Sequence, residues 1–218
     1  MRQLWKKLTF WVDRKPSKVN FSTRLIAYAL DWAIGGIIAG LPAVAIYGLV
    51  TDRSDMFSDL YVFPSLGYSV YWSYLAGFLS IILALIYLVY IPLKKYPGQT
   101  IGKRIMKLQI VRMDNQPLDL KTLLIRHVIG LMILESVSVV VARYYRQMLT
   151  MATGIYFEYY LMAIGSFITI ISAIMVYNTP SRRAVHDYLS GTTVVHLGDQ
   201  APQEKGKQKK NKRKHKRS

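Results

Sequence analysis

Four long, mostly apolar stretches constrain this chain more than any other feature of its sequence. A helix needs about 20 such residues to cross the roughly 30 Å of hydrocarbon in a bilayer. We predict helices of that length at about 25–47, 70–91, 123–142 and 156–177. Asp31 interrupts the first stretch, and Arg126, His127 and Glu135 interrupt the third. A buried soluble helix is the alternative for any single stretch, but four of them favour an all-α membrane protein, a four-helix bundle.

The placement of positive charge predicts how the bundle is oriented. Of the 29 Lys and Arg residues, 25 lie in residues 1–24, 92–122 and 178–218, whereas the two remaining connections hold three. Cytoplasmic loops carry the excess of Lys and Arg in membrane proteins. We therefore predict a multi-pass plasma membrane protein with both termini in the cytoplasm. A cleavable signal peptide ending near residues 43–45 is less favoured, because its apolar region would be long and would contain Asp31.

Composition divides the chain into three parts. Residues 1–20 form a cationic cytoplasmic segment, 21–197 the transmembrane domain, and 198–218 a polybasic tail. The last 15 residues hold nine cations, one Glu and no apolar residue, which is typical of disorder. Such a tail binds anionic lipid headgroups at about 1 kcal/mol per cation or RNA phosphates with a steep salt dependence. We expect lipid; nucleic acid and a purely solubilising tail stay open.

Ionised side chains inside the membrane region are the candidate functional residues, since a buried charge needs a partner or a function. Arg24 and Asp31 are seven residues apart, nearly two turns, and share one face of the first predicted helix. Arg126 and His127 enter the third predicted helix from the same cytoplasmic side. We predict that these four side chains converge on one polar cluster that either binds an ion or is structural.

Residues beyond the fourth predicted helix extend this cluster. A short helix is predicted over 181–189, and it would place Arg183 and Asp187, four apart, side by side. Asp187 then joins the cluster, unless it is a surface ion pair or a loop cap. Glu135 is a secondary candidate for a gate near the outer membrane face; the alternative is a single satisfied acid.

The central cytoplasmic loop contains two short predicted elements. Residues 101–108 alternate Lys and Arg with Ile and Leu, which suits a basic amphipathic turn on an anionic leaflet. Gly102 and Lys103 in this turn are secondary site candidates. Residues 107–112 and 192–196 are β-branched runs beside turn signals, and they predict two short strands that pair as an interfacial hairpin-like element.

Several chemistries find no support in the sequence. The chain has no Cys, and its four His residues lack metal-ligand spacing. The string GQTIGKR has three residues between its glycines and Arg after Lys, whereas a phosphate-binding loop needs four and then Ser or Thr. No nucleophile elbow or other catalytic arrangement is present. We predict neither an enzyme nor a protein that holds a metal or cofactor.

Three motifs together resemble the RDD family of small integral membrane proteins. They are FSTRLIAYALD at 21–31, GQTIGKRI at 98–105 and RRAVHDYLSGT at 182–192, in the order expected for the family. The resemblance spans about residues 18–197 and implies that Arg24, Asp31 and Asp187 are the Arg and two Asp that name the family. The turn at 113–117 departs from it, because a glycine is more usual there.

Two functions from different classes follow. Some RDD proteins are associated with sodium–proton antiport, so the resemblance implies a secondary transporter that exchanges monovalent cations or a small solute for protons at Asp31. Four helices are few for a transporter, which predicts a homo-oligomer. The alternative is a non-transporting membrane adaptor or assembly factor. In it Arg24, Asp31 and Asp187 form a structural clamp, and the basic tail binds anionic lipid or a partner.

Overall fold

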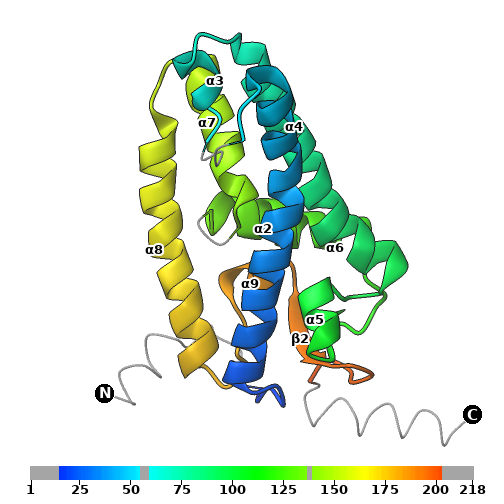
Figure 1. The fold of residues 1–218 in the computed structure, drawn as a ribbon. Coiled ribbons are helices and arrows are strands. Elements are labelled where there is room, and N and C mark those ends of the chain that lie inside the picture. The colour runs from blue at the N-terminus through cyan, green and yellow to red at the C-terminus, as the bar shows by residue number, and fades with distance from the viewer. Residues whose placement is uncertain (1–14, 55–58, 137–138, 203–218) are drawn as a thin grey trace, which may run out of the picture.

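The computed structural model describes residues 15–54, 59–136 and 139–202, so residues 203–218 of the predicted tail and most of the N-terminal segment lie outside the described residues. Residues 198–202, predicted as the start of a disordered tail, are instead packed on the fold, because Ala201 is buried and hydrogen-bonded to Asn115. Three long helices dominate the described fold, with shorter helices and one two-stranded sheet packed among them (Figure 1). In chain order the elements are α2 (Phe21–Thr51), α3 (Val62–Ser65), α4 (Val70–Leu85), η1 (Ile86–Lys95), α5 (Ile101–Ile105), β1 (Leu108–Arg112), α6 (Leu120–Leu124), η2 (Ile125–Leu134), α7 (Val141–Thr153), α8 (Phe157–Asn178), α9 (Val185–Leu189) and β2 (Thr192–His196).

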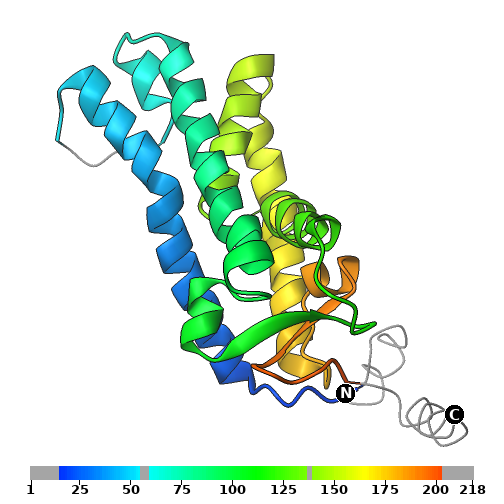
Figure 2. The same ribbon diagram turned by 90° about the vertical axis from the view of Figure 1, so that its right-hand side faces the viewer.

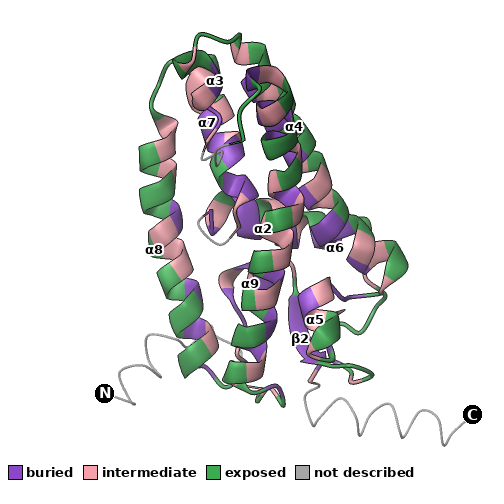
Figure 3. Ribbon diagram, in the orientation of Figure 1, coloured by how far each residue is buried: buried purple, intermediate pink, exposed green. Residues whose placement is uncertain are grey.

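Three of the predicted membrane helices are present as long apolar helices. Among the described residues, those long and apolar enough to cross a bilayer are Phe21–Thr51, Val70–Lys95 and Phe157–Asn178. The second of these consists of α4 and its π-helical continuation η1. Large apolar side chains such as Leu49 and Phe167 are 85% and 66% exposed on these helices, where lipid would cover them. Figure 3 shows exposed residues along α2, α4 and α8.

The predicted pair of strands is also confirmed, and it marks one end of the molecule. β1 and β2 pair antiparallel, with Ile110 opposite Val194. The same end carries α5, α9 and the start of α2 (Figures 1 and 2), and we call it the sheet end. The backbone N–H of Ser17 donates to the carbonyl of Pro180 at 2.8 Å, which fixes the chain before α2 to the chain after α8.

The third predicted helix, 123–142, is not one continuous helix. α6 and η2 run across the long helices, and Figure 2 shows this α6–η2 segment nearly end-on. η2 ends at Leu134. A separate helix, α7, begins at Val141 and runs to the end opposite the sheet (Figure 1). The physical reason lies at Glu135, whose backbone leaves the helical path with φ −92° and ψ 48°. There its carboxylate reaches polar partners that a straight membrane helix would deny it.

Small side chains hold the long helices together. Ala39 and Ala43 of α2 are buried with Ala76 and Ala84 of α4, and small residues allow two helix backbones to approach closely. At the sheet end, the buried strand residues Leu108, Ile110 and Val194 pack on Val19 and Ala27 at the start of α2. The sheet is therefore fixed against the first turns of α2, where Arg24 and Asp31 lie.

The turn that lacks the expected glycine finds a different solution. After β1, Asn115 adopts φ 58°, in the left-handed region that Asn tolerates better than most residues. Its side-chain oxygen accepts a hydrogen bond from the backbone N–H of Ala201 at 2.9 Å. Asn115 thus supplies both the turn conformation and a link to the chain beyond β2.

Candidate functional site

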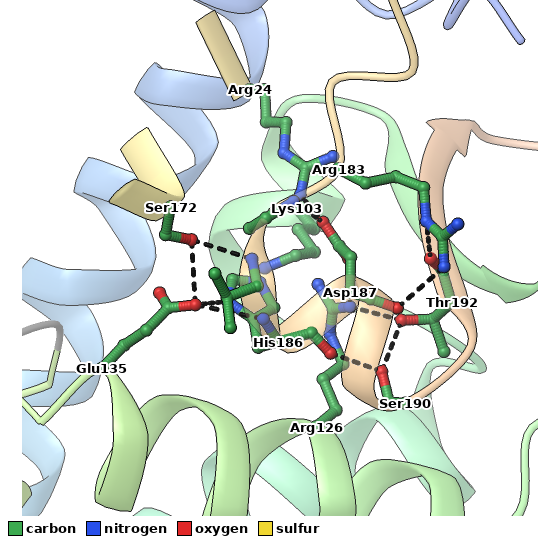
Figure 4. Close-up of polar contacts among 12 residues, drawn as sticks. Arg24, Lys103, Arg126, Glu135, Ser172, Arg183, His186, Asp187, Ser190 and Thr192 are labelled. Atoms are coloured by element: carbon green, nitrogen blue, oxygen red, sulfur yellow. Dashed lines mark hydrogen bonds and ion pairs between the residues drawn. The ribbon is translucent and has the colours of Figure 1, made fainter. Parts of the chain in front are cut away.

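The structure divides the predicted polar cluster between two buried carboxylates, and Glu135, predicted apart from it, forms a third cluster beside them. We name them the Asp31, Asp187 and Glu135 clusters. Arg24 belongs with Asp187 and not with Asp31, although it shares a helix with the latter. All three clusters lie toward the sheet end, and Figure 4 shows the second and third of them converging on α9.

The Asp31 cluster joins α2 to η1 and to the loop that leads into α5. One oxygen of Asp31 accepts from the Tyr87 hydroxyl at 2.7 Å and from the backbone N–H of Gly102 at 2.8 Å. The other accepts from the Thr100 hydroxyl and the Lys103 ammonium, both at 2.6 Å. Four donors therefore surround this buried carboxylate. Lys103, predicted to face an anionic leaflet, instead turns inward with its side chain 15% exposed.

Gly102 permits this arrangement, because α5 touches the backbone of α2 at that position. A Cβ added to Gly102 would lie 2.6 Å from the carbonyl oxygen of Ala27 and 2.7 Å from the backbone nitrogen of Asp31. We expect Gly102→Ala to lower the free energy of unfolding by about 1–3 kcal/mol, as overpacking does. The measurement is denaturation of the purified protein in mild detergent. The matched control is Gly40→Ala, whose Cβ would meet only the Tyr144 hydroxyl at 3.9 Å; an equal loss in both variants would contradict this reading.

The Asp187 cluster joins α9 to both α2 and η2. Asp187 is fully buried, and its two oxygens form ion pairs with Arg24 and Arg126 respectively. The backbone N–H of Ala184 also donates to it, at 2.8 Å. Arg126 donates a further hydrogen bond to the Thr192 hydroxyl at 2.5 Å, which ties in β2 (Figure 4). One carboxylate thus holds four segments that are distant in sequence.

Electrostatics keep Asp187 ionised in this setting. Burial raises the pKa of its carboxyl group, but the nearby Arg126 and Arg24 guanidinium groups outweigh burial and hold the pKa well below its usual range. Each of its three partners can only donate hydrogen bonds. A protonated or amide side chain at this position would place a donor against a donor.

Arg183 completes the surroundings of Asp187 in an unexpected way. It was predicted to pair with the carboxylate, yet its guanidinium donates to two backbone carbonyls, those of Asp187 at 3.0 Å and Thr192 at 2.9 Å. It also stacks over the Tyr188 ring, 4.1 Å from the ring centroid. Arg183 therefore fixes the backbone that presents Asp187. The predicted helix over 181–189 is correspondingly shorter and spans only α9.

The Glu135 cluster lies on the sheet-end side, close to α9, and not at the opposite face where an outer gate was expected. One oxygen of Glu135 contacts His186 twice, at the ring Nδ1 at 2.9 Å and at the backbone N–H at 3.1 Å. It also accepts from the Ser172 hydroxyl of α8 at 2.9 Å (Figure 4). Gly130 allows this approach, since a Cβ there would lie 2.5 Å from the Cβ of His186.

The remaining predicted residue, His127, is buried without a clear partner. It is 1% exposed, and neither ring nitrogen has a hydrogen-bond partner among the described residues. Sequence reasoning missed five site residues: Tyr87, Thr100, Ser172, His186 and Thr192. Thr100 lies inside the GQTIGKR motif, and His186 and Thr192 lie inside RRAVHDYLSGT, which were usable signals. Tyr87 and Ser172 are single hydroxyl residues without one. Within the described ranges, no group of three His, Asp or Glu side chains is placed to hold a metal ion.

These features define a class: a helical membrane protein whose buried ion pairs fasten a small sheet and short helices to one end of its long helices. The comparison with known families gives the class its name. A family model described as the RDD family matches residues 18–191, and the chain belongs to that family. Arg24, Asp31 and Asp187 all lie inside the matched range. No curated protein and no solved structure matches the chain.

Proposed function

We propose that this RDD family membrane protein is a non-transporting adaptor or assembly factor, in which the family's Arg and two Asp residues are structural. One observation carries the proposal: the oxygens of Asp31 are already filled by four donors, one of them the Lys103 ammonium. A transported cation would have to displace Lys103 from a buried pair. Asp187 is likewise engaged by two Arg side chains and a backbone N–H.

In this proposal the sheet end lies in the cytoplasm of a cell whose plasma membrane the long helices cross. The support is the positive-inside rule, because the chain segments that meet at this end carry most of the Lys and Arg residues. The three clusters hold α5, α9 and the sheet as a rigid platform beside the membrane. The basic residues of the tail, which lie in 203–218 outside the described residues, bind anionic lipid or an acidic partner. Homo-oligomers are expected only if the protein transports.

A second candidate, proton-coupled exchange of a monovalent cation or small solute, is favoured by a different observation. Glu135 and His186 line a cavity between α2 and α8, and the ring Nδ1 of His186 lies 2.9 Å from the Glu135 carboxylate. A carboxylate beside an imidazole at a cavity wall can pass a proton without breaking the clamp at Asp31 or Asp187. If the protein transports, we expect Glu135 to be the proton-carrying group.

Sodium and proton flux in liposomes distinguishes the two candidates. We expect purified wild-type protein to give no sodium-driven proton flux above that of empty liposomes, because its buried carboxylates are committed to structural pairs. Flux in the wild type that is lost in Glu135→Gln would overturn the adaptor and support the second candidate. Glu158→Gln is the matched control, since Glu158 lies at the opposite end and pairs with Arg143 at 3.7 Å. Both variants must first show wild-type unfolding midpoints.

A further inference from the structure

A cavity of about 190 Å³ lies between the first turns of α2 and the last turns of α8. Its walls are largely apolar, with Leu25, Ala27 and Tyr28 on one side and Thr169, Ala173 and Val176 on the other. Both walls belong to helices that are long and apolar enough to span a bilayer. Leu25 is 50% exposed and Ala173 is also exposed, so the cavity opens at the surface that faces lipid.

Three cationic side chains also line this cavity. They are Arg24, Lys103 and Arg126. Arg24 uses Nη2 for its ion pair with Asp187, while its Nη1 is buried and has no hydrogen-bond partner among the described residues. A buried guanidinium N–H without an acceptor is costly. Arg24 therefore lines a largely apolar cavity and keeps one guanidinium N–H group without an acceptor.

The charge around the cavity favours an anion at Arg24. Three cationic side chains line the cavity, whereas Asp31 and Asp187, the carboxylates that pair with them, do not line it. The one carboxylate that lines the cavity, that of Glu135, is engaged by His186 and Ser172. A ligand that fits must therefore be apolar along most of its length and negatively charged at one end.

The geometry points to a bound anionic phospholipid, with its phosphate at the Arg24 guanidinium and the upper part of one acyl chain between α2 and α8. Pockets that enclose a whole small molecule have about 300–1,000 Å³, so this cavity holds only part of its ligand. The rest of the lipid continues into the bilayer that surrounds both helices. Basic pockets between membrane helices at the cytoplasmic side are a recurring lipid headgroup site.

This inference is independent of the proposed function, because a lipid in this cavity would bind an adaptor and a transporter alike. It also differs from lipid binding by the tail, which requires only surface charge. The Phe21 and Tyr177 rings meet edge to face with centroids 5.1 Å apart, which joins α2 and α8 beside the cavity. A lipid seated there would contact both helices and strengthen their association.

The test is a titration of the detergent-purified full chain with phosphatidylglycerol, followed by the thermal unfolding midpoint. High salt screens the charge of the basic tail while leaving a buried site less affected. We expect phosphatidylglycerol to raise the midpoint saturably, whereas phosphatidylcholine and inorganic phosphate raise it little. Ala173→Phe fills the cavity from the α8 wall. It should weaken the apparent affinity for phosphatidylglycerol at least about tenfold, which is the fold-change expected from a modest overpacking cost.

Ala163→Phe is the matched control, because Ala163 is an exposed residue of the same helix that does not line the cavity. It should retain wild-type phosphatidylglycerol affinity. Leu25→Trp fills the cavity from the α2 wall. It gives an independent measure of phosphatidylglycerol affinity if Ala173→Phe changes the unfolding midpoint in the absence of lipid. Equal effects of both Phe variants, or equal stabilisation by phosphatidylcholine, would overturn the proposal. A full effect from inorganic phosphate alone would also overturn it, since the site would then bind a free anion.

Discussion

Asp187→Asn should be among the most destabilising single substitutions in this protein. The change removes the negative charge from two Arg side chains, of which Arg126 is 2% exposed. It also places an amide NH₂ group against partners that can only donate. Breaking a buried pair in this way typically costs about 3–5 kcal/mol. The measurement is the free energy of unfolding in detergent, together with the amount of protein recovered from the membrane.

The control uses the same substitution at an exposed pair. Asp114 binds Arg112 at 2.6 Å with half of its side chain exposed, and Asp114→Asn should leave the unfolding midpoint at its wild-type value. Acid gives a second check on Asp187. Because its folded-state pKa lies below the ordinary 3.8, its stabilisation is complete above that pH and is lost as the pH falls toward the folded value. The wild type and Asp187→Asn should therefore converge in stability in acid.

Asp31→Asn is the second substitution with a large expected effect. Gly102 N–H and the Lys103 ammonium can only donate, so one of them would face the new amide NH₂ group. The buried Lys103 would also lose its counter-charge. We expect a loss of about 3–5 kcal/mol in the free energy of unfolding, measured as for Asp187.

A matched control for Asp31 is Asp199→Asn. Asp199 also pairs with a Lys, Lys18, but at 3.4 Å and with the Lys side chain 80% exposed. Surface pairs of this kind contribute little. A wild-type midpoint is expected for Asp199→Asn, and a comparably stable Asp31→Asn would argue against a structural clamp at Asp31.

The long helices were predictable because apolar length is a local property of the sequence. α2, α4 with η1, and α8 follow directly from it. The third predicted helix failed because hydropathy records how apolar a window is and not the direction in which the chain runs. There the partners of Glu135, which are His186 and Ser172, come from segments far along the chain. Only the folded structure shows that His186 and Ser172 lie beside the end of η2.

The site was predictable in its members but not in its pairing. Helix periodicity correctly placed Arg24 and Asp31 on the same side of α2, yet it could not tell that a different segment would reach each of them. Asp187 of α9 pairs with Arg24, and Lys103 of α5 pairs with Asp31. These choices depend on the close contact at Gly102 and on the sheet, which brings α5 and α9 to the same end. Such contacts leave no periodic signal in one sequence.

The most direct test of the clamp is a double-mutant cycle on Asp31 and Lys103, with the free energy of unfolding as the readout. The variants are Asp31→Asn, Lys103→Met and the two combined. A structural pair predicts that the combined variant is more stable than Asp31→Asn alone, because Met removes the buried charge that the single variant leaves without a partner. Losses that simply add would contradict the clamp, since they would mean that the two side chains do not stabilise the fold through each other.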